Sequence, residues 1–185
     1  MTDRIAVIGA GQMGNGIAHV FAQAGMPVTM IDVSDDALRR GRETIEKNME
    51  RQVKKNTLSA DDRTAALGRI ATSTDLGAVG NATVVIEAAT ESTELKFRLF
   101  ADLDRIAPAG AILASNTSSI SITHIGAQTK RPQQVIGMHF MNPVPVMQLV
   151  EVIRGLATSD ETSQRVVDLA KALGKTPVEA NDYPG

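Results

Sequence analysis

The stretch Arg4–Gly14, RIAVIGAGQMG, decides how the rest of the chain is interpreted. Its first half, Arg4–Ile8, is short and apolar, which predicts a buried strand. Glycines in the spacing G-x-G-x-x-G follow, and a helical pattern begins among them and stops at Gly25. The next predicted strand, Pro27–Ile31, ends at the acidic residue Asp32. This order of elements is the sequence fingerprint of a dinucleotide-binding βαβ unit.

Each part of the fingerprint has a physical task. Gly9 allows a tight turn, Gly11 lets the backbone approach a pyrophosphate, and Gly14 lets the helix pack closely on the strand. The carboxylate of Asp32 would accept hydrogen bonds from a ribose diol and repel a 2′-phosphate, so NAD is favoured over NADP. A glycine turn with Asp32 as a mere helix cap is the alternative. The predicted cofactor-binding set is Gly9, Ala10, Gly11, Gln12, Met13, Gly14 and Asp32.

Downstream, predicted strands and helices alternate, which favours a parallel sheet with helices on both faces. A basic segment at about 35–68 is expected to form a helical excursion. The expected fold is α/β, a Rossmann-like doubly wound, mainly parallel sheet with an antiparallel edge. Thr158 and Glu161 have the spacing of a capping box for the last helix. The other predicted strands are Ile70–Thr72, Thr83–Ala88, Ala111–Ala114, Val135–His139, Met147–Ile153 and Pro177–Ala180, and the other helices are Glu94–Ile106, Ser121–Ala127 and Asp160–Leu173.

The segment Gly137–Ile153, GMHFMNPVPVMQLVEVI, places His139 on one apolar run and Glu151 on the next. A carboxylate in an apolar strand is costly to bury unless it has a partner. Both residues are equally far from Pro145, so antiparallel pairing of the two runs would make them cross-strand neighbours. A histidine held by a carboxylate is a general base with its orienting group. His139 could instead be a core histidine, and Glu151 could pair with Arg154.

Composition excludes several classes of function. The chain has 185 residues, a net charge of −2, no cysteine and few aromatic residues. These values give no reason to expect a nucleic-acid partner, a membrane, a disulfide framework or a thiolate metal site, and no metal site of any other kind is supported. The apolar strand begins by Ile5, which leaves no room for a signal peptide, so a cytoplasmic location is expected.

With these residues assembled, the chain resembles the NAD-binding domain of L-3-hydroxyacyl-CoA dehydrogenases, particularly the bacterial 3-hydroxybutyryl-CoA type. The resemblance covers essentially the whole chain and includes two long, specific motifs besides the glycine fingerprint. The matching stretches are GAGQMGNGIA at Gly9–Ala18, VVIEAATE at Val84–Glu91, ASNTSSI at Ala114–Ile120 and GMHFMNPVPVMQLVEVI at Gly137–Ile153.

The resemblance implies roles for individual residues. His139 would be the catalytic base and Glu151 its partner, Ser118 would hydrogen-bond the substrate's 3-oxygen, and Asn142 would lie beside the nicotinamide and the histidine. From the residues alone, Ser118 could instead cap the helix near residue 121, and Asn142 could be a turn residue.

Further residues are implied to contact the cofactor or the substrate. Glu91 and Lys96 would contact the nicotinamide side and the ribose of NAD, and Lys54 and Lys55 would lie where the excursion meets the CoA nucleotide. On spacing alone, Glu91 could support a helix N-terminus and Lys96 could be a solvated helix residue. A solvated helix face is the simpler interpretation of Lys54 and Lys55.

Domain organisation and activity are also implied. Residues 1–180 are expected to form the NAD-binding domain, and residues 181–185 to begin a linker to a helical C-terminal domain that is absent here and that carries the family's dimer interface. The expected activity is NAD-dependent oxidation of (S)-3-hydroxyacyl-CoA to 3-ketoacyl-CoA, with little or no turnover by this chain alone. The alternatives are a dehydrogenase of a free hydroxy acid or sugar acid, and a non-catalytic NAD-binding module.

Overall fold

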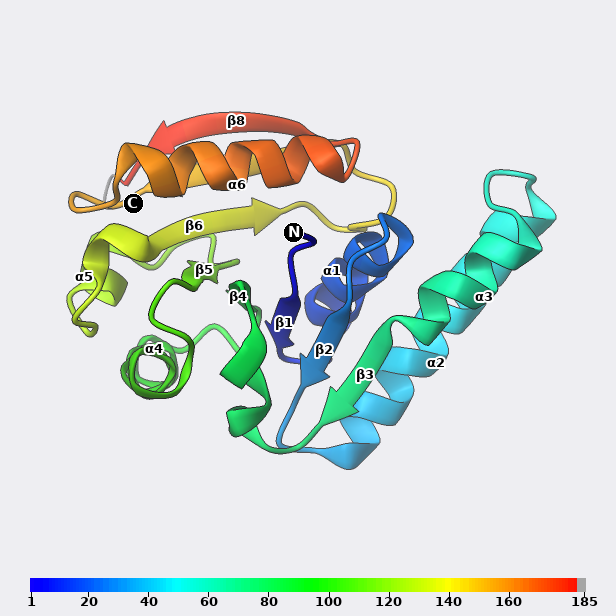
Figure 1. The fold of residues 1–185 in the computed structure, drawn as a ribbon, viewed down its shortest axis with the longest axis horizontal. Coiled ribbons are helices and arrows are strands. Elements are labelled where there is room, and N and C mark those ends of the chain that lie inside the picture. The colour runs from blue at the N-terminus through cyan, green and yellow to red at the C-terminus, as the bar shows by residue number, and fades with distance from the viewer. Residues whose placement is uncertain (183–185) are drawn as a thin grey trace.

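The computed structural model describes residues 1–182, and its strands form one sheet (Figure 1). The eight strands lie in the order β3-β2-β1-β4-β5-β6-β7-β8. All neighbouring pairs are parallel except β6 and β7, which are antiparallel. The predicted α/β, Rossmann-like fold with an antiparallel pair is therefore confirmed. The strands are β1 (Ile5–Ile8), β2 (Val28–Ile31), β3 (Ile70–Ser73), β4 (Val84–Glu87), β5 (Ile112–Ser115), β6 (Val135–Phe140), β7 (Leu149–Arg154) and β8 (Thr176–Asn181).

Helices cover both faces of this sheet. In β1, Ile5 and Val7 pack with the cluster that includes residues of α1, α2 and α6, while Ala6 and Ile8 pack with residues of α4 and α5. A strand buried on both sides must be apolar at every position, which is why β1 reads as a continuous apolar run. The helices are α1 (Gln12–Gln23), α2 (Asp35–Lys54), α3 (Ala60–Gly68), α4 (Thr93–Ile106), α5 (Ile122–Gly126) and α6 (Asp160–Ala172), with short 3₁₀ turns η1 (Leu76–Asn81) and η2 (Pro132–Gln134).

The predicted excursion at 35–68 is the helix pair α2 and α3, which projects beyond the sheet as an antiparallel arm (Figure 1). Both helices begin at serine caps: Ser34 accepts from the Ala37 N–H, and Ser59 accepts from the Asp62 N–H. The arm returns to the sheet at β3, which pairs with the outer side of β2. No helix in the described part of the chain is long and apolar enough to cross a membrane.

Two local features differ from the expectations from sequence. The prediction of a capping box at Thr158 and Glu161 is wrong, because Ser159 is the N-cap of α6 and its hydroxyl accepts from the Thr162 N–H. The Thr158 hydroxyl instead donates to the Val135 carbonyl and accepts from the N–H of the residue after β7, so it joins strand ends rather than starting the helix.

The last strand, β8, continues to Asn181, one residue beyond the predicted strand end at Ala180. Asn181 is still paired with Arg154 in the β7–β8 ladder. The Asp182 carboxylate accepts from the Ser121 hydroxyl at 2.7 Å and the Thr123 N–H at 2.8 Å. Burial alone would raise the pKa of Asp182, but these hydrogen bonds outweigh it and hold the pKa below its usual range. The rest of the predicted linker, residues 183–185, lies outside the described residues.

Candidate active site

The candidate site residues follow the carboxyl ends of the parallel strands. The glycine loop follows β1, Asp32 follows β2, and the segments with Glu91 and Ser118 follow β4 and β5. The strand order reverses between β1 and β4, and ligands of open α/β sheets bind in the crevice at such a switch point. The topology therefore gathers these segments at one edge of the sheet.

The glycine loop is shaped by close backbone contacts. Gly9 has a φ of +107°, which favours glycine, and a Cβ on Gly14 would lie 1.9 Å from the Gly9 carbonyl oxygen. Gly11 differs, because a Cβ there would meet no protein atom within 4 Å. Gly11 is also the N-cap of α1 and has no side-chain cap. The free N–H groups of α1 therefore face an open space suited to an anion such as a pyrophosphate.

Asp32 is fixed by backbone donors on both of its oxygens. Its Oδ2 accepts from the Ala10 N–H at 2.9 Å, and its Oδ1 accepts from the Ser34 N–H at 3.0 Å. The α2 cap is Ser34, so the alternative of Asp32 as a mere helix cap does not hold. The carboxylate joins the glycine loop to the end of β2, the position at which a ribose diol would be recognised.

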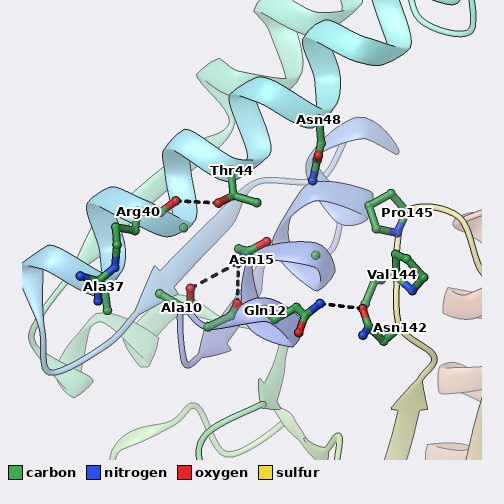
Figure 2. A pocket seen from close by; sticks show the side chains of 14 residues that line it. Ala10, Gln12, Asn15, Ala37, Arg40, Thr44, Asn48, Asn142, Val144 and Pro145 are labelled. Carbon is green, nitrogen blue, oxygen red and sulfur yellow. Dashed lines mark hydrogen bonds between the residues drawn. The ribbon is translucent and has the colours of Figure 1, made fainter.

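A pocket of about 430 Å³ lies between the glycine loop, α2 and the bend that follows β6 (Figure 2). Gln12 Nε2 donates to Asn142 Oδ1 at 3.2 Å across this pocket, and Asn15 Nδ2 donates to the Gly11 carbonyl at 2.6 Å (Figure 2). The wall contributed by α2 consists of Ala37, Arg40, Gly41, Thr44 and Asn48. The structure thus brings the predicted cofactor residues Gln12 and Asn142 together, although they are 130 positions apart.

The bend itself is held in place by a buried lysine. Lys175, at the turn between α6 and β8, is 8% exposed. Its ammonium donates to the carbonyl oxygens of Val144 at 2.7 Å and Met147 at 2.6 Å. Burial lowers the pKa of Lys175 from its usual value. We call this arrangement the Lys175 clamp.

His139 and Glu151 form the predicted cross-strand pair. They are register partners on β6 and β7, and His139 Nδ1 lies 3.1 Å from Glu151 Oε2. Arg154 instead contacts Asp160 and the Thr158 carbonyl, which removes the alternative pairing of Glu151. With Nδ1 directed at the carboxylate, the imidazole can use Nε2 to exchange a proton with a ligand.

Ser118 lies near this pair and does not cap a helix. It is exposed, and it lines a pocket of about 220 Å³ together with Glu151. The N-cap of α5 is Ser121, whose hydroxyl accepts from the His124 N–H. The Ser118 hydroxyl is therefore available to a ligand.

Glu91 and Lys96 occupy different environments. Glu91 has a 46% exposed side chain, and it accepts hydrogen bonds from the hydroxyls of Thr117 and Ser119. Lys96 is 1% exposed, and its ammonium lies 2.5 Å from Glu87 Oε1 and 3.7 Å from Glu91 Oε2. The alternative of Lys96 as a solvated helix residue is therefore wrong.

Lys54 and Lys55 lie at the end of α2, away from the two pockets that contain Asn142 and Ser118. Lys54 pairs with Glu50 at 3.2 Å and its side chain is 72% exposed. No cluster of metal-ligating side chains occurs among the described residues.

The family description "3-hydroxyacyl-CoA dehydrogenase, NAD binding domain" matches residues 4–183. The chain belongs to this family. The domain binds NAD, and the open approach at Gly11 together with the fixed Asp32 carboxylate fits that cofactor.

Known members of the 3-hydroxyacyl-CoA dehydrogenase family match along nearly the whole chain. It is 52% identical over 182 residues to a probable 3-hydroxybutyryl-CoA dehydrogenase of Bacillus subtilis, covering 98% of this chain and 63% of the relative. It is 44% identical to the human mitochondrial hydroxyacyl-coenzyme A dehydrogenase, covering 98% of this chain and 60% of that protein. The chain thus spans less than two thirds of the length of these relatives.

Solved structures of the family agree with the fold. A crystal structure of (S)-3-hydroxybutyryl-CoA dehydrogenase from Ralstonia eutropha has a TM-score of 0.97 and 46% sequence identity, and the match covers all of this chain and 65% of that chain. A prephenate dehydrogenase from A. aeolicus, with a TM-score of 0.70 and 13% identity, shows the same fold and nothing further.

Three residues near the site were missed at the level of sequence. Asn116 Oδ1 accepts from the Phe140 N–H at 2.8 Å and so ties the end of β6 to the segment after β5. Glu87 and Ser115 are buried beneath the segments that carry Glu91 and Ser118. Glu87 had a detectable signal, since it is a carboxylate in an apolar strand, as Glu151 is.

Proposed function

We propose that this chain is the NAD-binding part of a dehydrogenase that oxidises (S)-3-hydroxyacyl-CoA, such as 3-hydroxybutyryl-CoA, to 3-ketoacyl-CoA. The observation that carries the proposal is the His139–Glu151 pair, 3.1 Å apart, on strands that lead into a bend touching the glycine loop. Oxidation of a secondary alcohol needs a base near the hydride acceptor, and this arrangement supplies one.

The chemistry is divided among three side chains. His139 takes the hydroxyl proton at Nε2, while Glu151 holds the imidazole tautomer through Nδ1 and stabilises the imidazolium that forms. The Ser118 hydroxyl donates to the substrate oxygen as its charge develops. When bound, NAD⁺ would accept the hydride from the substrate carbon that carries the hydroxyl. In the reverse direction, His139 returns the proton to the oxygen.

Asn142 and Glu91 are proposed to position the nicotinamide end. Asn142 Oδ1 accepts from Gln12, which leaves its Nδ2 free to donate toward the reacting groups. Glu91 is half-exposed and can accept hydrogen bonds from the ribose or the carboxamide. Lys96 is proposed to act through Glu91, since its own ammonium is buried.

The substrate's CoA nucleotide is proposed to lie along the arm of α2 and α3. Lys54 and Lys55 are exposed cations at the end of α2, and cations there can meet phosphate groups. Because the chain spans less than two thirds of the length of its relatives, the rest of the active site and the dimer interface are proposed to lie in a helical C-terminal domain. The side chains of His139 and Glu151 are 19% and 39% exposed, so water reaches the base and its partner. We therefore expect this chain alone to bind NAD with little turnover.

A chimera tests the proposal. The described chain would replace the matching segment of the Bacillus subtilis relative, and consumption of NADH would be followed with acetoacetyl-CoA. We expect the chimera to turn over acetoacetyl-CoA. The 185-residue chain should bind NADH but show at most trace turnover. Reduction of free 3-keto acids or of the keto (dehydro) forms of sugar acids, but not of acetoacetyl-CoA, would overturn the substrate class. NADH binding without turnover by the chimera would indicate a binding module.

A further inference from the structure

Glu87 is a charged residue at the end of an otherwise apolar strand, and it is 0% exposed. Its carboxylate has three partners. Oε1 accepts from Lys96 Nζ at 2.5 Å and from the Ala89 N–H at 2.8 Å, and Oε2 accepts from the Ser115 hydroxyl at 2.6 Å. Both oxygens of this buried carboxylate are therefore hydrogen-bonded.

These partners belong to separate elements. Glu87 ends β4, Ser115 ends β5, and Lys96 lies in the first turns of α4. The Ser115 oxygen also accepts from the Thr117 N–H at 3.2 Å, at the start of the segment that leads to Ser118. One carboxylate thus connects the two segments that carry the candidate site residues Glu91 and Ser118.

The charges of this cluster are unequal. Two carboxylates, Glu87 and Glu91, face the single ammonium of Lys96, and that ammonium is 1.2 Å closer to Glu87 (3.7 Å less 2.5 Å). Because Glu87 takes the short contact, the Glu91 carboxylate stays half-exposed and is held by the Thr117 and Ser119 hydroxyls. Removal of the Glu87 charge would leave Glu91 as the one anion near Lys96, and Glu91 would be drawn inward.

A buried ion pair is a poor way to gain stability, because apolar residues of the same volume often do as well. What it gives here is a defined geometry at the edge of the sheet where the nicotinamide is expected. We propose that Glu87 is a positioning residue for the nicotinamide end of the cofactor: through Lys96 and Ser115 it keeps Glu91 directed outward and sets the segment that carries Ser118. This inference rests on the proposed NAD-dependent function.

The test compares two ligands on the 185-residue chain. NADH has both halves of the cofactor, and ADP lacks the nicotinamide and the ribose that carries it. Glu87→Gln should weaken NADH binding about tenfold, because a displaced Glu91 would lose its charged hydrogen bonds to the nicotinamide end. The affinity for ADP, which is bound by the glycine loop and Asp32, should change less than about twofold. If Glu87 had a purely structural role, Glu87→Gln would weaken the binding of both ligands by a similar factor.

Two further variants protect the test from a folding artefact. Glu87→Gln/Lys96→Met removes both buried charges and should fold. Because no ammonium is left to draw Glu91 inward, this double variant should lose less NADH affinity than Glu87→Gln alone. Asp104→Asn is the matched control, since it removes the carboxylate charge of a largely buried pair with Arg131, at 3.0 Å, at the opposite end of the same helix. It should leave the ratio of the two affinities unchanged.

Each other outcome overturns the inference. Equal losses for NADH and ADP, a double variant that loses as much NADH affinity as Glu87→Gln alone, or unchanged NADH binding would show that Glu87 does not position Glu91 through Lys96. If the unmodified chain binds ADP as tightly as NADH, the positioning role is wrong while the NAD site stands. If it binds neither ligand, the proposed function fails as well.

Discussion

His139 Nδ1 lies 3.1 Å from Glu151 Oε2 across the β6–β7 pair, where the two residues are direct register partners. They are 12 positions apart in sequence, and β6–β7 is the one antiparallel ladder among the described strands. The pair is therefore built by a local antiparallel connection near one end of a mainly parallel sheet, with β8 on the outer side of β7. The glycine loop and Asp32, in contrast, follow β1 and β2 in the other half of the sheet.

Replacement of His139 by glutamine should separate catalysis from binding. In the chimera, turnover of acetoacetyl-CoA should fall about 10²–10⁴-fold, because a general base contributes that much. The dissociation constant for NADH should change less than about twofold, since the glycine loop and Asp32 are untouched. Steady-state rates and fluorescence titration of NADH measure the two quantities. Equal losses in both would contradict the assignment of His139 as the base.

Two glycines of the same loop should respond in opposite ways to alanine. Gly11→Ala should leave the free energy of unfolding within about 1 kcal/mol, because its Cβ meets no protein atom within 4 Å, but it should block the approach of the pyrophosphate. Gly14→Ala should cost about 3 kcal/mol or more, because its Cβ would lie 1.9 Å from the Gly9 carbonyl oxygen. Urea unfolding and NADH titration distinguish them. Normal NADH binding by Gly11→Ala would show that the cofactor does not cross this loop.

The Asp32 carboxylate should set the preference for NADH over NADPH. Asp32→Asn keeps an oxygen for the Ala10 N–H but loses the charge that repels a 2′-phosphate. NADH affinity should fall, and the ratio of NADH affinity to NADPH affinity should decrease about tenfold. Asp35→Asn removes an exposed charge three positions on in the chain and should leave the ratio unchanged. A wild-type chain that binds NADPH as tightly as NADH would contradict this role.

His19 should make stability depend on pH. Burial lowers its pKa below the usual value of about 6.5, and the hydrogen bonds to Gln23 and Gln52 offset this in part. The unfolded chain therefore binds a proton more readily, so the free energy of unfolding should fall as pH drops below about 6.5.

The contribution of His19 is measured as a difference between variants. Between pH 8 and pH 5, the free energy of unfolding in urea should depend less steeply on pH for His19→Gln than for the unmodified chain. His124→Gln, which alters an exposed histidine, should retain the full dependence. Parallel curves for the chain and His19→Gln would contradict the prediction.

Much of the architecture could be predicted because its signals are local. The glycine spacing, Asp32 and the apolar runs identify the βαβ unit, and the symmetry about Pro145 predicts the contact of His139 with Glu151. What could not be predicted depends on packing between distant segments. The residues around Lys96 in sequence do not indicate that its ammonium is buried against Glu87. Thr158 does not cap the last helix, because its hydroxyl donates to the distant Val135 carbonyl, a contact that local spacing cannot predict.

Because of the Lys175 clamp, the active site depends on a residue outside its recognisable motifs. Every recognisable motif ends by Ile153, so an exchange of segments between relatives just beyond Arg154 would transfer the histidine, the glutamate and the asparagine. It would leave behind the ammonium that fixes the carbonyls of Val144 and Met147, and with it the shape of the bend that presents Asn142. The motif and the turn between α6 and β8, which has no recognisable motif, therefore work as one unit.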